Sequence, residues 1–228
     1  MDSQALKIVY RYGLIVLVAI SVFSCKREVT KKLPYYNTPD FTPLWLQNGD
    51  KTDTLHVVAP FSFTDQEGKT INNASYKGTV YVANFFFTSC PGICPRMMKN
   101  MKKVADSFRY DERVKFLSHS VTPNIDSVPR LKKYAGRFDI DEGQWKLVTG
   151  NHDEIYTLAR KSYFAEEEIG LNKDATEFLH TEHFILVDAH GHLRGIYNGT
   201  VDLEMQRLCE DIRLLLAEET LNTSTFSK

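Results

Sequence analysis

The chain has 228 residues, a formal net charge of −1 and a charged fraction of 25%. Without a basic excess, these values argue against nucleic acid as a partner. About 180 residues follow the N-terminal segments, which is enough to bury one sizeable core, and the sequence contains no internal repeat or low-complexity tract.

The first 25 residues have the pattern of an export signal. Lys7 and Arg11 give a positive start, and the uncharged apolar run 13–23 is shorter than the roughly 20 residues of a transmembrane helix. Ser24-Cys25 resembles the lipobox of bacterial lipoproteins, in which the cysteine is acylated and becomes the mature N-terminus. We therefore expect lipidation at Cys25, with an uncleaved anchor helix or an ordinary signal peptide as alternatives. Each alternative places the rest of the chain outside the cytoplasm, on or near a membrane.

Residues 26–49 are expected to form a tether, because this stretch carries charges and three prolines (Pro34, Pro39 and Pro43) but no steady period. A single domain is expected over 50–228. It opens with alternating residues 56–69 that close on a glycine-containing turn, which predicts a β-hairpin.

The remaining segments predict an α/β order. The apolar run 80–87 indicates a buried strand of a parallel sheet. A helix follows from Pro95, and its methionine stripe, Met97, Met98 and Met101, is assigned to the core rather than to copper. Further strands are expected at 114–121, 145–150, 184–188 and 193–197, helices at 127–138, 151–161 and 202–218, and an exposed loop at 164–177. This order predicts a thioredoxin-like fold with an N-terminal β-hairpin and an inserted helix/strand region.

Two cysteines occupy the turn between the apolar strand and the helix. Cys90 and Cys94 are four residues apart, so on a helical turn both sulfur atoms can point at one object or at each other. A helix N-terminus offers partial positive charge and free N–H groups, which stabilise the thiolate form that binds metal or attacks disulfides. Cys209 instead falls on an apolar helical stripe and is expected to be a core residue.

The motif Phe85-Phe86-Phe87-Thr88-Ser89-Cys90-Pro91-Gly92-Ile93-Cys94-Pro95 resembles the Sco/SenC family of copper chaperones, which help to assemble the dinuclear copper centre of cytochrome c oxidase. The resemblance extends from about Phe61 to the last helix and includes Ser120-Val121, Pro123 and Asp126. It implies copper, Cu(I) or Cu(II), as the ligand of Cys90 and Cys94.

The resemblance also implies a histidine as third ligand, eleven residues before the glycine of the last hairpin turn. With Gly191 as that glycine, the ligand is His180, and His183 is the alternative. The chain departs from the family at Thr122, where an aspartate is usual. It also departs at Ala189-His190-Gly191, where Pro-Asp-Gly is usual, and this adds His190 and His192, expected to be exposed.

Two functions follow from the resemblance. One is a membrane-anchored metallochaperone that holds copper through two cysteines and a histidine. The other is a thiol-disulfide reductase, in which Cys90 and Cys94 are a redox-active pair that reduces the oxidase's copper-site cysteines. A peroxiredoxin-like peroxidase is a third possibility, against which the paired Cys-Pro motif argues. The implied partners are the copper-bearing oxidase subunit, the membrane, other copper carriers and thiol-disulfide proteins, with the domain facing the periplasm or cell exterior.

Overall fold

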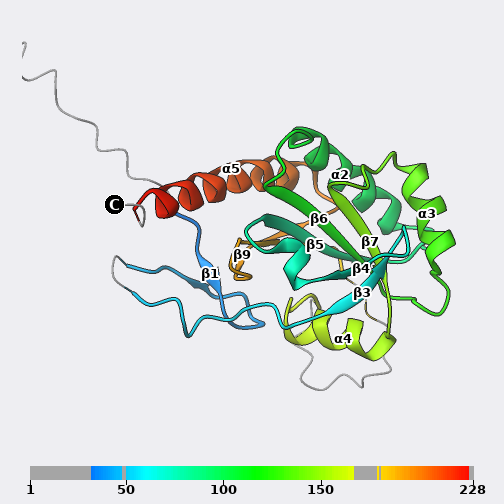
Figure 1. Ribbon diagram of the computed structural model, residues 1–228, viewed down its shortest axis with the longest axis horizontal. Helices are drawn as coiled ribbons and strands as arrows, with labels where there is room; N and C mark the ends of the chain where they lie inside the picture. The colour runs from blue at the N-terminus through cyan, green and yellow to red at the C-terminus, as the bar shows by residue number, and fades with distance from the viewer. Residues whose placement is uncertain (1–31, 48–49, 167–178, 180, 226–228) are drawn as a thin grey trace, which may run out of the picture. The chain divides into compact units, whose positions relative to one another are not determined.

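A seven-stranded mixed sheet forms the centre of the computed structural model, which describes residues 32–47, 50–166, 179 and 181–225, with side chains described to residue 220 (Figure 1). The spatial order of the strands is β4-β3-β7-β6-β5-β8-β9. β5, β6 and β7 run parallel, while β3, β8 and β9 pair antiparallel to their neighbours. The strand bounds are β3 Ser62–Asp65, β4 Thr70–Asn72, β5 Val80–Phe86, β6 Val114–Ser120, β7 Trp145–Thr149, β8 His183–Val187 and β9 Leu193–Asn198.

Helices cover both faces of this sheet. The helices α2 (Ile93–Ser107), α3 (Val128–Arg137) and α5 (Asp202–Thr225) contribute to one apolar core. α4 (His152–Lys161) packs into a second core on the opposite face, and a short 3-10 helix, Asn73–Tyr76, follows β4. Within the residues described, no helix is both long and apolar enough to cross a bilayer.

The central strand explains why the sheet is buried on both sides. All seven residues of β5 are buried, and neighbouring positions alternate between the two cores, Val82 and Phe86 on one and Ala83 and Phe85 on the other. The methionine stripe of α2 is also buried, which confirms its assignment to the core. The thioredoxin-like α/β fold with an N-terminal hairpin, β3–β4, is thereby confirmed.

One predicted surface segment is partly wrong. Phe164 and Ala165 were assigned to an exposed loop, but their exposed fractions are 7% and 0%. The glutamates that follow dominated the sequence pattern, whereas the Phe164 ring packs 4.5 Å from the ring of His56, a contact across more than a hundred residues. Residues 167–178 of the same segment lie outside the described part of the chain.

The segment before the first hairpin is packed rather than extended. Residues Tyr35–Tyr36 (β1) and Pro43–Leu44 (β2) form a small antiparallel sheet of their own. Leu33 is buried in the first core. From Lys32 onward these residues belong to the same compact unit as the sheet, so this part of the expected tether differs from the prediction.

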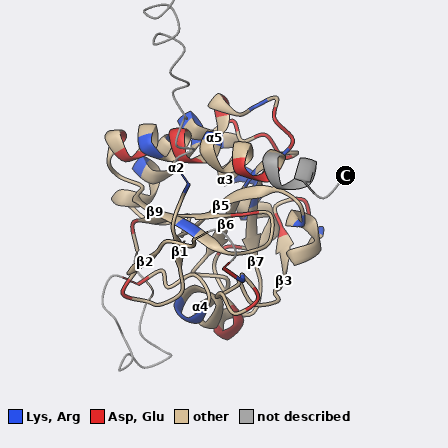
Figure 2. Ribbon diagram, turned by 90° about the vertical axis from the view of Figure 1, so that its left-hand side faces the viewer, with Lys and Arg blue, Asp and Glu red and all other residues tan. Residues whose placement is uncertain are grey.

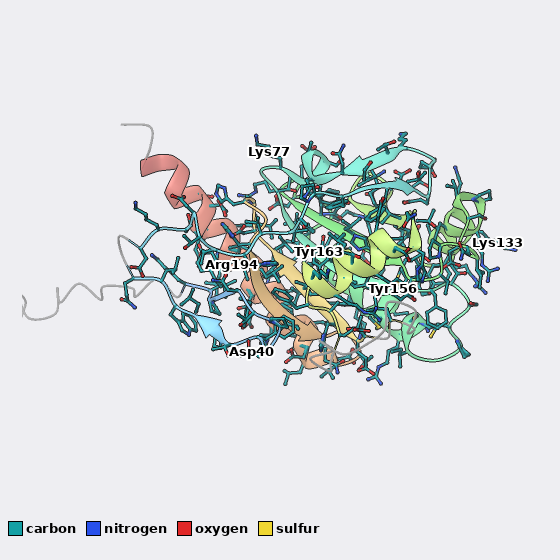
Figure 3. The ribbon with its side chains drawn as sticks, turned by 90° about the horizontal axis from the view of Figure 1, so that it is seen from below. Asp40, Lys77, Lys133, Tyr156, Tyr163 and Arg194 are labelled. Atoms are coloured by element: carbon teal, nitrogen blue, oxygen red, sulfur yellow. The ribbon has the colours of Figure 1, made fainter. Side chains whose placement is uncertain are left out.

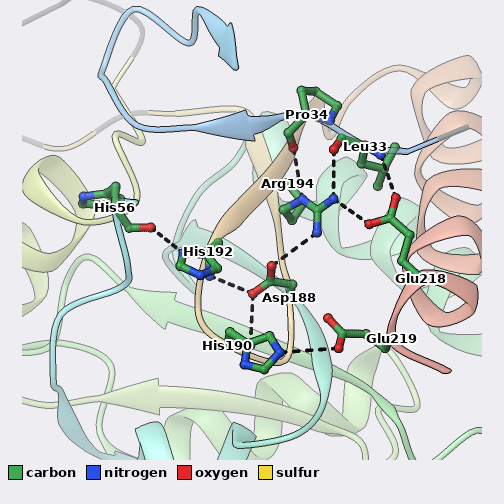
Figure 4. Close-up of polar contacts among 9 residues, drawn as sticks. All are labelled: Leu33, Pro34, His56, Asp188, His190, His192, Arg194, Glu218 and Glu219. Carbon is green, nitrogen blue, oxygen red and sulfur yellow. Dashed lines mark hydrogen bonds and ion pairs between the residues drawn. The ribbon is translucent and has the colours of Figure 1, made fainter. Parts of the chain in front are cut away.

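A buried arginine of β9 holds that segment in place (Figure 4). The guanidinium of Arg194 donates to the main-chain carbonyls of Leu33 at 2.8 Å and Pro34 at 3.1 Å. The carboxylates of Glu218 at 2.7 Å and Asp188 at 3.3 Å balance its charge. We call this group the Arg194 clamp. A buried cation is tolerated only with such partners, so the clamp ties the start of the domain to its last helix and last hairpin.

We expect Arg194→Ala to lower the free energy of unfolding by about 3–5 kcal/mol, because the change leaves two carboxylates and two carbonyls buried without their donor. Chemical denaturation measures this loss. Lys132→Ala is the control, since Lys132 is exposed and pairs with Glu67, a surface arrangement worth less than about 1 kcal/mol. Equal losses in the two variants would contradict the structural role of the clamp.

Candidate metal centre

The cysteine motif lies at one edge of the sheet, where the carboxyl ends of β5 and β6 meet the start of β8. Cys90 lies in the turn after β5, and its N–H donates to the carbonyl of Phe87 at 3.3 Å. Cys94 is the second residue of α2, whose N-cap is Gly92. Functional groups of open α/β sheets gather at this kind of edge.

The two thiols are both free and differ strongly in their surroundings. Cys90 is partly exposed and Cys94 is 4% exposed. Burial raises the pKa of Cys90, but hydrogen bonds from the N–H groups of Cys94, Gly92 and Ile93 outweigh burial, so the net pKa is below its usual value. Burial raises the pKa of Cys94 to about 12. Cys90 is therefore the accessible and more acidic thiol, and Cys94 is the buried, less acidic thiol.

One buried carboxylate fixes the turn that carries Cys90. Asp126, fully buried after β6, accepts hydrogen bonds from the N–H of Thr88 at 3.1 Å and from its hydroxyl at 2.5 Å. The hydroxyl of Ser120 donates to it at 2.6 Å. Arg130 donates to the Thr88 hydroxyl at 2.6 Å and lies 3.4 Å from Asp126. Thr88 is only two residues from Cys90, so this network sets the position of the cysteine turn.

The departure at Thr122 fits this network. Its hydroxyl donates to Asp126 at 3.0 Å, and the N–H of Asp126 donates back to the Thr122 carbonyl at 2.8 Å. A second carboxylate at position 122 would bring a like charge toward Asp126, whereas the threonine supplies another donor. Position 122 is thus a supporting position in this chain.

A tyrosine of α3 lies beside the cysteines and was not singled out from the sequence. Tyr134 is buried, its ring stacks on Phe86 at 5.4 Å, and the charges of Cys94 and Cys90 act on it. Its hydroxyl has no hydrogen-bond partner among the described residues. The helical spacing of Tyr134 with Leu131 and Ala135 indicates only a core position, so no local pattern signals that this residue lies near the cysteines.

The candidate third ligand, His180, lies outside the described residues, and His183 is the first residue of β8. Along β8, Phe184 and Leu186 face the core that contains Cys94, while Ile185 faces the opposite core. His183 has the parity of Ile185, and its ring lies 6.1 Å from that of Phe41 on the opposite side. The ring of His183 is therefore on the side of the sheet away from Cys94. Among the residues described, no three His, Cys, Asp or Glu side chains form a metal-binding group.

Other histidines considered as ligands lie elsewhere. His119 is fully buried on the opposite face of the sheet, stacked on Phe85 at 4.9 Å, and burial lowers its pKa to about 3. His190 and His192 lie in the β8–β9 turn at the far edge of the sheet. Contrary to the expectation that both are exposed, His192 is buried and its Nδ1 donates to the carbonyl of His56 at 3.0 Å. The long contact to His56 could not be read from the turn sequence.

Comparison with known proteins identifies relatives over most of the chain. Residues 49–217 match the family model SCO1/SenC. The crystal structure of a SCO1/SenC family lipoprotein from Bacillus anthracis is 30% identical, with a TM-score of 0.61, over 71% of this chain and 95% of that one. BsSco, described with a disulfide switch as a member of the Sco family of cytochrome c oxidase assembly proteins, is 29% identical, with a TM-score of 0.60, over 72% and 96%.

A copper-bound relative shares the fold. Bradyrhizobium japonicum ScoI with copper bound is 23% identical, with a TM-score of 0.56, over 70% of this chain and 99% of that one. At this identity the likeness concerns the fold alone. The bound copper is a property of that protein.

The opposite acidities of the two thiols predict the order in which they react. In the reduced, metal-free protein, iodoacetamide should alkylate Cys90 first, with its half-maximal rate at a lower pH than for an unperturbed cysteine. Cys94 should stay protonated and slow up to about pH 12. Peptide mass spectrometry across a pH series measures both rates.

Cys209 is the internal control for this experiment. Burial raises its pKa, so its alkylation should begin at higher pH than that of Cys90. A common midpoint for Cys90 and Cys209, or faster reaction of Cys94, would contradict the assignment of Cys90 as the accessible and more acidic thiol.

Proposed function

This chain belongs to the SCO1/SenC family, and on that premise we propose that it is a membrane-anchored metallochaperone for the dinuclear copper centre of cytochrome c oxidase. The observation that carries the proposal is the pair of free thiols at the strand-to-helix edge, one accessible with a lowered pKa and one buried with a raised pKa. Such a pair can accept a soft metal ion from one protein and release it to another.

Cys90, Cys94 and His180 are the residues proposed to hold copper. Thiolates favour Cu(I) and imidazole also suits Cu(II), so this set fits either oxidation state. The lowered pKa of Cys90 lets its thiolate form more easily, whereas Cys94 must lose its proton on binding, which makes affinity rise with pH. The Asp126 network keeps the turn in place, so that little ordering of the main chain is needed when the metal enters.

Anchoring through a lipid at Cys25 is part of the proposal. The sequence before Cys25 has the lipobox-like pattern, and the Bacillus anthracis relative is described as a lipoprotein. The compact unit begins at Lys32, so the anchor would hold the domain outside the cytoplasm at a membrane surface.

The alternative is a thiol-disulfide reductase, which the unequal thiols also favour. The Cys90 thiolate would attack a disulfide in the oxidase's copper-bearing domain, forming a mixed disulfide and releasing one partner thiolate. Cys94, after losing its proton, would then attack Cys90 and release the second, so that two electrons pass to the partner. Reduction of that domain's disulfide by the metal-free protein, without copper transfer, would identify this function.

Copper stoichiometry tests the metallochaperone. Reduced protein of residues 32–228, which keeps the Arg194 clamp, should bind one copper ion tightly, measured by metal analysis after gel filtration. Cys90→Ala and Cys94→Ala should each abolish tight binding, because each removes one of only two thiolates at the site. Cys209→Ala, the matched control, should bind like the wild type. Full binding in both motif variants would refute the proposal.

The third ligand is tested by the visible spectrum of the Cu(II) form. His180→Ala should weaken Cu(II) and shift its thiolate charge-transfer band, while Cu(I) loses less affinity because two thiolates suffice for it. His183→Ala should leave the band nearly unchanged, since its side chain faces Phe41 on the other side of the sheet. The reverse pattern would place the ligand three residues later in the chain.

A further inference from the structure

The two helices nearest the cysteines carry most of their charge with one sign. α2 and α3 together contain eight lysines and arginines and a single acidic residue, Asp106. The whole chain has a net charge of −1, so the remainder of the molecule is acidic. The basic residues are Arg96, Lys99, Lys102 and Lys103 on α2 and Arg130, Lys132, Lys133 and Arg137 on α3. Figure 2 draws the lysines and arginines of the chain in blue.

Several of these charges are committed to neighbouring carboxylates and several are not. Lys102 pairs with Asp106, Lys103 with Asp202, and Lys132 with Glu67, at 2.6–3.0 Å. Four exposed side chains form no ion pair within the part of the chain that the structure describes: Arg96, Lys99, Lys133 and Arg137. With Arg130, they make up what we call the basic face.

The basic face begins beside the cysteine turn. Arg130 reaches Thr88 at 2.6 Å, two residues before Cys90. Arg137 lies two helical turns further along the same side of α3, and its charge acts on Tyr134, which lies beside Cys94. On α2, Arg96 and Lys99 follow within five residues of Cys94. The field of unpaired charges around a cleft or site steers ligands of opposite sign toward it.

Resting on the proposed function, we propose that the basic face is the docking surface for the acidic side of the protein that exchanges copper or electrons with Cys90 and Cys94. Complementary charge raises the rate of encounter and fixes the orientation of two proteins. A site that transfers copper or electrons needs both a fast encounter and a fixed orientation. The thiols of the two proteins must come close together while the complex lasts, and the complex is short-lived.

The position of the basic face favours a protein partner over an anionic membrane. Lys133 lies at one end of the view in Figure 3, whereas Arg194 and Asp40 lie toward the other. The Arg194 clamp holds Leu33, the start of the domain, at the sheet edge opposite the cysteines. If the domain is attached to the membrane through that end, the basic face is not the surface nearest to the bilayer.

Small disulfides test whether the field reaches the thiols. The ratio of rate constants with dianionic dithiobis(nitrobenzoate) and neutral dithiodipyridine should fall roughly tenfold in Lys99→Glu/Lys133→Glu/Arg137→Glu, and also fall in wild type as salt rises. The matched control is Lys51→Glu/Lys77→Glu/Lys161→Glu, which makes the same charge change at exposed lysines outside α2 and α3 and should change the ratio less than about twofold. The triple variant with glutamine at the same three positions should lower the ratio by an intermediate amount. This variant and circular dichroism spectra check that a lower ratio does not come from misfolding. Equal ratios in the two triples would overturn the proposal.

The docking itself is tested with the purified, reduced copper-bearing domain of the cytochrome c oxidase from the same organism. Its association rate with residues 32–228 should fall roughly tenfold in the first triple and stay near wild type in the control. The docking surface would be refuted if the copper-bearing domain did not associate with the wild-type protein. It would also be refuted if the first triple variant lost binding to phosphatidylglycerol vesicles and not to this domain. Copper binding to each variant is measured in parallel. If the docking proposal fails while the copper stoichiometry is unchanged, the proposed function still holds.

Discussion

The candidate metal centre depends on one buried carboxylate. Asp126 has no exposed surface and would be costly to bury as an isolated charge, yet it accepts hydrogen bonds from main-chain and hydroxyl donors in the turn after β5 and at the end of β6. It thereby joins the end of β5 to the end of β6. The loop that Thr88 holds in place leads directly into α2. The N–H groups at the start of α2 are those that lower the pKa of Cys90.

The same geometry serves metal binding and redox chemistry. An accessible thiolate above a protonated, buried thiol is suited to attack a disulfide, and the same two sulfur atoms can converge on a metal once the second proton leaves. Copper delivery and thiol reduction therefore do not require two sites.

Local patterns made the fold and the two cysteine positions predictable. The uninterrupted apolar run of β5, the glycine turns of the hairpins and the four-residue cysteine spacing each depend on neighbours in the sequence. The features that were missed depend on distant neighbours. Arg194 meets Leu33 across 161 positions, and the Phe164 ring packs on His56. Such contacts leave no periodic pattern in the sequence, so the packed residues at the start of the domain had the pattern of a tether. Tyr134 looked like any core residue of its helix, because nothing in the spacing of α3 shows what lies opposite it.

The Arg194 clamp has a consequence for reach. Only seven residues, 26–32, separate Cys25 from Leu33. Fully extended, they span at most about 25 Å. With the lipid proposed at Cys25, this short segment would keep the end of the sheet at the Arg194 clamp close to the bilayer. The cysteines lie beyond the seven residues of β5, a further strand length of about 23 Å. The thiols would therefore stand at a limited height above a membrane to which Cys25 is attached, and a partner protein would have to present its own site at a matching height.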